Sequence, residues 1–192
     1  MASRRFSGGL SRLPGLSLVA GVATAEALLA LGFGGVRLKW PNDLVVVHDD
    51  GLRKLGGLLV EGGGEAGAPA RAVIGLGLNV AMPVVGADAI DQAWTDLASL
   101  APRPPGRNAI VAMLLGHWLP ALAQFDDLGL EPFLARYAAF DALAGRAVRV
   151  KREGGWREGE ALGLAADGAL RVRVDGVEQL VHAGEVSVRA TT

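Results

Sequence analysis

The chain has 192 residues, of which 51% are hydrophobic and 20% charged, and its formal net charge is −1. This composition is that of a folded globular protein, excludes a disordered or fibrous chain, and offers no dense basic stripe for DNA or RNA. The absence of cysteine excludes disulfides, thiolate nucleophiles and Cys-ligated zinc, and the three histidines lack metal-ligand spacing.

The first predicted element is a helix over residues 15–31, where apolar residues recur at helical spacing and Gly32 and Gly34 supply the stop. Arginines ahead of this apolar stretch suggest an export signal, but Glu26 interrupts it, so an amphipathic helix is the better interpretation. No uncharged apolar run is long enough to span a bilayer. We therefore expect a cytoplasmic protein with no membrane partner.

Four strands follow, over residues 36–40, 44–48, 54–61 and 71–80, with a turn signal at Asp49-Asp50-Gly51 between the second and third. The last two strands carry internal glycines, which remove packing and weaken a strand. They indicate that a ligand or another backbone passes close to the sheet, although a bulge or crowded packing explains any single one equally well. These glycines are Gly56, Gly57, Gly75 and Gly77.

The second half predicts an irregular stretch over 82–93, a helical fragment over 94–100, and helices over 108–125 and 131–140. From residue 146 to 189 the pattern changes to short alternating strands separated by Gly-Gly and Asp-Gly turns. Such closely spaced hairpins predict a small, SH3-like β-barrel. We therefore expect two domains, residues 1–143 and residues 144–192.

The most informative peptide is Lys39-Trp40-Pro41-Asn42-Asp43, which lies between two predicted strands. Asn and Asp at such a turn can hold a nucleotide, a magnesium ion or an incoming amine. An ordinary turn capped by its own side chains is the alternative. Other phosphate-binding motifs fail: the glycine strand lacks the third glycine of a dinucleotide fingerprint, and Walker and G-x-S-x-G sequences are absent.

Three peptides together, KWPNDL, RKLGGLLVE and VIGLGLNV, resemble in order and spacing the signature of the biotin protein ligases. The resemblance implies an α+β fold, with a mixed sheet and packed helices like class II aminoacyl-tRNA synthetases, followed by an SH3-like barrel. It implies ATP-dependent conversion of biotin to biotinyl-5′-AMP and transfer to a lysine of the biotin carboxyl carrier protein domain of acetyl-CoA carboxylase, with ATP, Mg²⁺ and biotin as cofactors and substrates.

The resemblance also implies roles for individual residues. Lys54 is the expected catalytic cation at the biotin carboxylate and phosphate, and Asp43 the expected general base and metal ligand. The apolar cluster under the loop over 82–93 is expected to be Val85, Ile90 and Trp94. The remaining expected contacts with biotin and nucleotide are Lys39, Asn42, Gly56, Gly57, Leu58, Gly75, Gly77 and Asn79.

The sequence departs from the family pattern in lacking a Thr-Asn biotin-site motif, a G-R-G-R-x-G-R loop and a helix-turn-helix DNA-binding segment. We expect no repressor activity, and we expect the missing basic loop to impair adenylation. Two alternatives therefore stay open: an inactive truncated fragment that still binds adenylate or a partner, and a lipoate ligase relative. A monomer and a sheet-edge homodimer are both compatible with the sequence.

Overall fold

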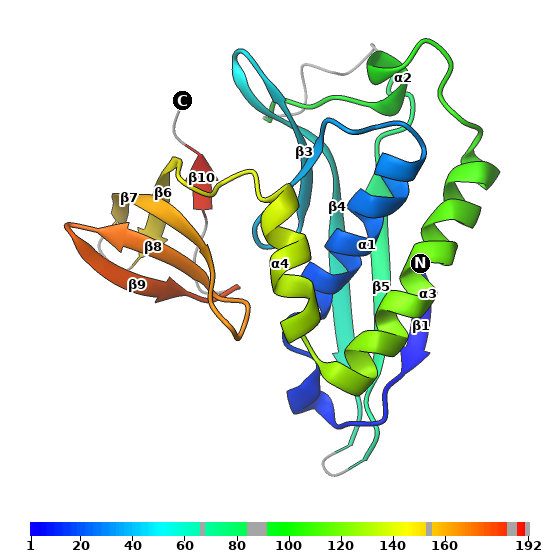
Figure 1. Cartoon of the computed structure of the whole chain (residues 1–192), viewed down its shortest axis with the longest axis horizontal. Coiled ribbons are helices and arrows are strands. Elements are labelled where there is room, and N and C mark those ends of the chain that lie inside the picture. Colours follow the sequence, from blue (N-terminus) through cyan, green and yellow to red (C-terminus); the bar gives the residue numbers. More distant parts are fainter. Residues whose placement is uncertain (66–67, 84–91, 153–154, 184–187, 191–192) are drawn as a thin grey trace.

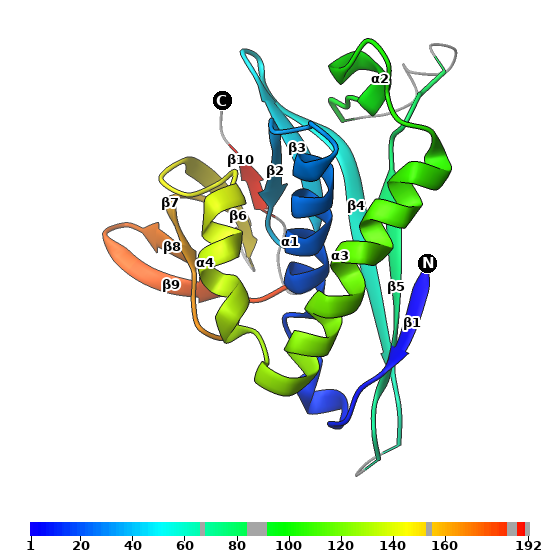
Figure 2. The ribbon, with the colours of Figure 1, turned by 45° about the vertical axis from the view of Figure 1, so that its right-hand side comes forward.

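The computed structural model describes residues 1–65, 68–83, 92–152, 155–183 and 188–190. Helices α1, α3 and α4 lie on one side of a first sheet, and a second sheet lies beyond α4 (Figures 1 and 2). The helices are η1 (Leu10–Arg12, a 3₁₀ turn), α1 (Leu16–Ala30), α2 (Leu97–Leu100), α3 (Arg107–Leu128) and α4 (Glu131–Phe140). The strands are β1 (Ala2–Arg5), β2 (Val36–Lys39), β3 (Asp43–His48), β4 (Gly51–Gly63), β5 (Arg71–Leu78), β6 (Ala147–Arg152), β7 (Gly155–Leu164), β8 (Leu170–Val174), β9 (Val177–Val181) and β10 (Val188–Ala190).

The first sheet has the strand order β1-β5-β4-β3-β2, and its pairings are antiparallel. The α+β class expected from the sequence is confirmed. The parallel character of the expected mixed sheet is limited, among the described residues, to isolated bridges that join Leu38 to Asp141 and Lys54 to Trp94. Strands β1 and β2 form the two edges of this sheet.

Helix α1 lies between the first sheet and the other helices, and it is buried on nearly every side. A helix that is apolar all round is expected in such an interior position. A Cβ atom on Gly21 would lie 3.5 Å from the Leu38 side chain and 3.6 Å from that of Leu58. The glycine thus lets α1 approach the strands closely, directly beneath the part of the sheet that carries the signature peptide.

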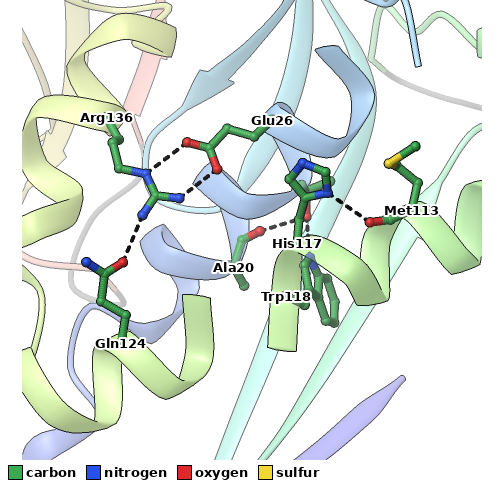
Figure 3. Close-up of polar contacts among 8 residues, drawn as sticks. Ala20, Glu26, Met113, His117, Trp118, Gln124 and Arg136 are labelled. Carbon is green, nitrogen blue, oxygen red and sulfur yellow. Dashed lines mark hydrogen bonds and ion pairs between the residues drawn. The ribbon is translucent and has the colours of Figure 1, made fainter. Parts of the chain in front are cut away.

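Buried and half-buried polar contacts fix the helices to one another (Figure 3). The Trp118 indole Nε1–H donates to Thr24 Oγ1 at 2.9 Å, and Thr24 Oγ1 donates to the Ala20 carbonyl at 2.7 Å. Arg136 on α4 donates two hydrogen bonds to Glu26 on α1, at 2.8 and 2.6 Å, in a bidentate pair. The helix layer is therefore tied together independently of the sheet.

Helix α3 is longer than the 108–125 expected, and its length and hydropathy alone would allow it to cross a membrane. One face packs against α1, with Ile110, Leu114 and Trp118 buried. A core helix of a folded domain meets the same criteria, so this helix is weak evidence for a membrane span.

The second sheet has the order β10-β6-β7-β8-β9, with antiparallel pairings between successive neighbours. Its core consists of alternating inward-facing side chains such as Val148, Val150 and Val172. Asp175 and Gly176, at φ 52° and 79°, form the two-residue turn that the sequence predicts between β8 and β9. The boundary expected after residue 143 falls in the connection between α4 and β6.

Candidate adenylate site

The signature peptide Lys39–Asp43 forms the turn between β2 and β3, at the β2 edge of the first sheet, where Trp40 contacts Gly168 of the second sheet. Trp40 is 1% exposed, and the Trp40–Pro41 peptide bond is cis. Asn42 Nδ2 donates to the Leu58 carbonyl at 2.7 Å, and the Leu58 N–H donates to the Asn42 carbonyl at 2.8 Å. The Asn42 amide therefore holds the turn to β4, and its expected contact with nucleotide stays a prediction.

Lys54 and Asp43 form an ion pair that joins two of the signature peptides. Lys54 Nζ lies 2.6 Å from Asp43 Oδ1, and Lys39 Nζ lies 3.7 Å from Asp43 Oδ2. The side chain of Asp43 is 14% exposed, whereas that of Lys54 is 34% exposed and still reaches solvent. Two ammonium groups therefore share one carboxylate at this turn, and that of Lys54 is a fixed cation of the kind that stabilises developing negative charge.

A β-bulge puts Lys54 on the ligand side of the sheet. In the β3–β4 register Leu44 pairs with Gly56 and Val45 with Lys54, so Leu55 is an extra residue on β4. Residues 54 and 57 would face opposite sides of a regular strand, because side chains alternate. With the bulge, a Cβ atom on Gly57 would lie 3.4 Å from Lys54 Cε and 3.2 Å from Asp43 Oδ1. The ion pair therefore lies directly over Gly57.

The four strand glycines differ in what surrounds them. A Cβ atom on Gly56 would collide with the Gly77 carbonyl oxygen, so the backbone of the neighbouring strand crowds this position. On Gly77 the nearest heavy atom would be the Gly57 carbonyl oxygen, 3.9 Å away, which leaves the space above this residue open. On Gly75 it would meet Leu59 and Met1 at 3.6–3.9 Å. Crowded packing therefore explains Gly56, and an open ligand surface fits Gly77.

The open space is a pocket of about 450 Å³ that combines residues of two of the three signature peptides, RKLGGLLVE and VIGLGLNV. It is lined by Lys54, Gly56, Gly57, Gly77, Leu78, Asn79, Met82, Gln92 and Trp94. A second pocket, of about 360 Å³, lies on the second sheet and shares no residue with the signature peptides; it is lined by Val150, Arg157, Val172, Val174, Asp175, Gln179 and Val181. The first pocket is therefore the candidate site.

Asn79 and the segment around Trp94 hold Lys54 in place from the other side. The Lys54 N–H donates to the Ala93 carbonyl and the Thr95 N–H to the Lys54 carbonyl, both at 2.9 Å. Asn79 Nδ2 donates to the Thr95 carbonyl at 3.0 Å. Because Trp94 takes part in this bridge to β4, the helical fragment expected over 94–100 shortens to α2, Leu97–Leu100.

Not every predicted site residue reaches the pocket. The Leu58 side chain is 2% exposed and faces α1, because it alternates with Gly57 along the strand. Lys39, Asn42 and Asp43 instead line a recess on the helix side of the turn, with Asp43 joined to the pocket through Lys54. Val85 and Ile90 lie outside the described residues.

Asp96 is a residue of this site that sequence reasoning missed. Its Oδ2 accepts the Met82 N–H at 2.6 Å, and its Oδ1 accepts the Ser99 N–H at 2.8 Å, so one carboxylate caps α2 and fixes the pocket residue Met82. Burial raises the pKa of Asp96, but the hydrogen bonds from Met82 and Ser99 outweigh it and hold the pKa below its ordinary value. The only signal for this role in the sequence is the position of Asp96 directly before the helix, because aspartate is a preferred N-cap residue.

Replacing Asp96 with alanine is expected to lower the free energy of unfolding by about 1–3 kcal/mol at neutral pH, since two backbone donors lose their acceptor. Because the pKa is depressed in the folded state, the contribution is present above the ordinary aspartate pKa of about 3.9 and is lost as pH falls below it. Urea unfolding across this pH range measures the effect. The exposed Asp127→Ala variant is the control; equal losses in both variants at neutral pH would contradict the assignment.

Comparison with known proteins identifies related chains for both domains. Residues 3–79 match the model of the Biotin/lipoate A/B protein ligase family, and residues 144–189 match that of the Biotin protein ligase C terminal domain. The chain is 39% identical over 186 residues to the Bifunctional ligase/repressor BirA of Salmonella typhimurium, covering 97% of this chain and 57% of that protein. The chain belongs to the biotin protein ligase family.

Other members of the biotin protein ligase family align over nearly the whole chain. The Biotin--[acetyl-CoA-carboxylase] ligase of Paracoccus denitrificans is 28% identical over 190 residues, covering 95% of this chain and 76% of that protein. The crystal structure of the Aquifex aeolicus biotin protein ligase superposes with a TM-score of 0.80 at 23% identity, covering 98% of this chain and 81% of that one. The fold, including its C-terminal SH3-like domain, is thus the family fold. The chain spans slightly more than half the length of the Salmonella relative.

Proposed function

We propose that this chain handles biotinyl-adenylate in an ATP-dependent biotin ligase, with a carrier-domain lysine of acetyl-CoA carboxylase as the final acceptor. The observation that carries the proposal is the Lys54 ammonium group, held by Asp43 at the edge of a glycine-lined pocket of about 450 Å³. The Paracoccus relative bears the name of this activity, and an Aquifex structure of the same fold was determined in complex with biotin and ATP.

In the first step a carboxylate oxygen of biotin attacks the α-phosphorus of ATP, forming biotinyl-5′-AMP as the bond to pyrophosphate breaks. In the second step the carrier lysine amine attacks the acyl carbon, forming the amide as AMP leaves. Both steps concentrate negative charge at the acyl-phosphate linkage, where a fixed cation lowers the barrier. Lys54 would supply that cation, and Asp43 would orient it and accept a proton from the attacking amine.

The proposed Mg²⁺ would depend mainly on the nucleotide. The described residues contain no group of three His, Cys, Asp or Glu side chains that could hold a metal, and Asp43 already accepts from Lys54. Mg²⁺ commonly keeps several waters and binds one or two carboxylates together with substrate phosphates. One carboxylate at the turn fits an ion of that kind, so Asp43 remains the proposed protein ligand. The positive charge of the Mg²⁺ ion would help neutralise the phosphates.

The test separates the two half-reactions. Purified chain is incubated with an apo-carrier domain and either ATP, Mg²⁺ and biotin or preformed biotinyl-5′-AMP, and the carrier mass is measured. Label on the carrier lysine in the first arm supports the full activity, and label in the second arm alone supports transfer only. Lipoic acid in place of biotin tests the lipoate ligase alternative. Absence of label in both arms, together with no binding of biotinyl-5′-AMP, would contradict the proposal.

The absence of cysteine suits a reducing compartment, and we include a cytoplasmic location in the proposal. Fractionation of cells that express the chain tests this part separately.

A further inference from the structure

The indole of Trp40 makes a hydrogen bond that joins the signature turn to the second sheet. Its Nε1–H donates to the Gly168 carbonyl oxygen at 3.0 Å, and the indole is 1% exposed. Gly168 lies in the turn between β7 and β8, in the domain that stands beyond α4 in Figure 1. A buried indole N–H without an acceptor destabilises the folded state. The hydrogen bond therefore constrains the positions of both Trp40 and Gly168.

The Gly168 turn packs closely against the first domain. Gly168 has φ +85°, and its N–H donates to the Ala165 carbonyl at 2.9 Å. A Cβ atom at this position would lie 2.8 Å from a Leu18 methyl group on α1 and 2.9 Å from one of Leu130, just before α4. The Cα of Gly168 therefore lies close to the side chains of two helical elements of the first domain.

Strand β2 is also held at Leu38, two residues before Trp40. The Ala142 N–H donates to the Leu38 carbonyl at 2.8 Å, and Asp141 forms a parallel bridge with Leu38. The chain that leads into the second sheet thus contacts β2 at Leu38, while the sheet itself contacts Trp40. These two contacts fix the position and direction of the strand immediately before Asn42 and Asp43.

We propose that Trp40 is a positioning residue, and that its hydrogen bond to Gly168 makes the second sheet part of the site that holds Lys54. Trp40 precedes Asn42, which exchanges hydrogen bonds with Leu58, and Asp43, whose Oδ1 lies 2.6 Å from Lys54 Nζ. Release of Trp40 would loosen this turn and weaken the Lys54–Asp43 pair. The catalytic meaning of this inference rests on the proposed function, but the change at Lys54 can be measured without it.

The test uses two of the three lysines of the chain, Lys54 and Lys151. Trace acetylation followed by peptide mass spectrometry gives the ratio of Lys54 to Lys151 labelling, with the exposed Lys151 on β6 as internal reference. The Trp40→Phe variant removes the donor and keeps an aromatic ring. We expect the ratio to rise about fivefold, the change that corresponds to about 1 kcal/mol for one hydrogen bond.

The matched control is Trp118→Phe, which also removes a buried indole donor, here from Thr24 in the helix layer (Figure 3). It should leave the labelling ratio at the wild-type value. If the activity assay succeeds, Trp40→Phe should also lower kcat for adenylate formation more than it raises KM for ATP, whereas Trp118→Phe should change neither. A general loss of stability would move both variants alike.

A second pair of variants tests the acceptor. Gly168→Ala should displace the turn and raise the Lys54 ratio, because a methyl group would collide with Leu18 and Leu130. Gly176→Ala has a similar φ of +79° but meets nothing within 4 Å, so it should leave the ratio unchanged. Wild-type ratios in folded Trp40→Phe and Gly168→Ala would overturn the inference. Failure of the wild-type chain to label a carrier would instead count against the proposed function alone.

Discussion

Replacing Lys54 with methionine is expected to reduce the rate of biotinyl-5′-AMP formation on the order of 10²- to 10³-fold, the usual loss for one preorganised donor at a developing charge. Methionine keeps much of the length of the side chain and removes only the ammonium group. The side chain of Lys54 is 34% exposed, and its partner Asp43 remains within 3.7 Å of Lys39, so the fold should persist. Single-turnover adenylate formation and urea unfolding of the same preparations measure the two effects.

The control for this variant is Lys151→Met, which removes an exposed ammonium group from the second sheet. It changes the net charge of the chain equally, so a long-range electrostatic effect would appear in both variants. We expect Lys151→Met to match the wild-type chain. Binding of a stable biotinyl-adenylate analogue, measured by calorimetry, extends the comparison to conditions without turnover. A Lys54→Met chain with wild-type rate and affinity would exclude Lys54 from the chemistry.

The sequence predicts the elements around the site well because their signals are local. Helix α1 ends one residue before the expected position, and β2 and β3 begin within one residue of theirs. Helical spacing, the Pro41 break and the Asp-Gly turns each depend on residues within a few positions of one another. Residues 36–48 therefore come out nearly as the sequence predicts.

The relations between these elements are harder to predict. The Leu55 bulge depends on pairing with Val45 and Leu44, and without it the alternation rule places Lys54 and Gly57 on opposite faces. The acceptor of the Trp40 indole is a backbone carbonyl, which carries no side-chain signature. Asp96 shows only a helix-cap pattern, although its carboxylate also holds Met82. Each of these contacts is decided by tertiary packing, so a motif identifies the residue but not its partner.

The glycine motif provides the second large prediction, because its members have different surroundings. Gly77→Val should keep the fold, since the nearest heavy atom to the new Cβ would be 3.9 Å away and a β-branched residue suits a strand. It should weaken binding of the adenylate analogue by about 1–3 kcal/mol, or roughly five- to 150-fold in Kd, because its methyl groups would occupy the pocket. Calorimetric titration and urea unfolding measure both quantities.

Gly56→Ala should behave in the opposite way, although it lies in the same pocket. Its Cβ would collide with the Gly77 carbonyl and lie 3.3 Å from Leu78 Cα, and both are backbone atoms that cannot rotate aside. We expect the free energy of unfolding to fall by about 1–3 kcal/mol, the usual range for overpacking. A stable Gly77→Val chain that binds the analogue normally would show that nothing passes close to this strand. In that case the glycine at position 56 would serve sheet packing, and Gly77 would have no function in ligand binding.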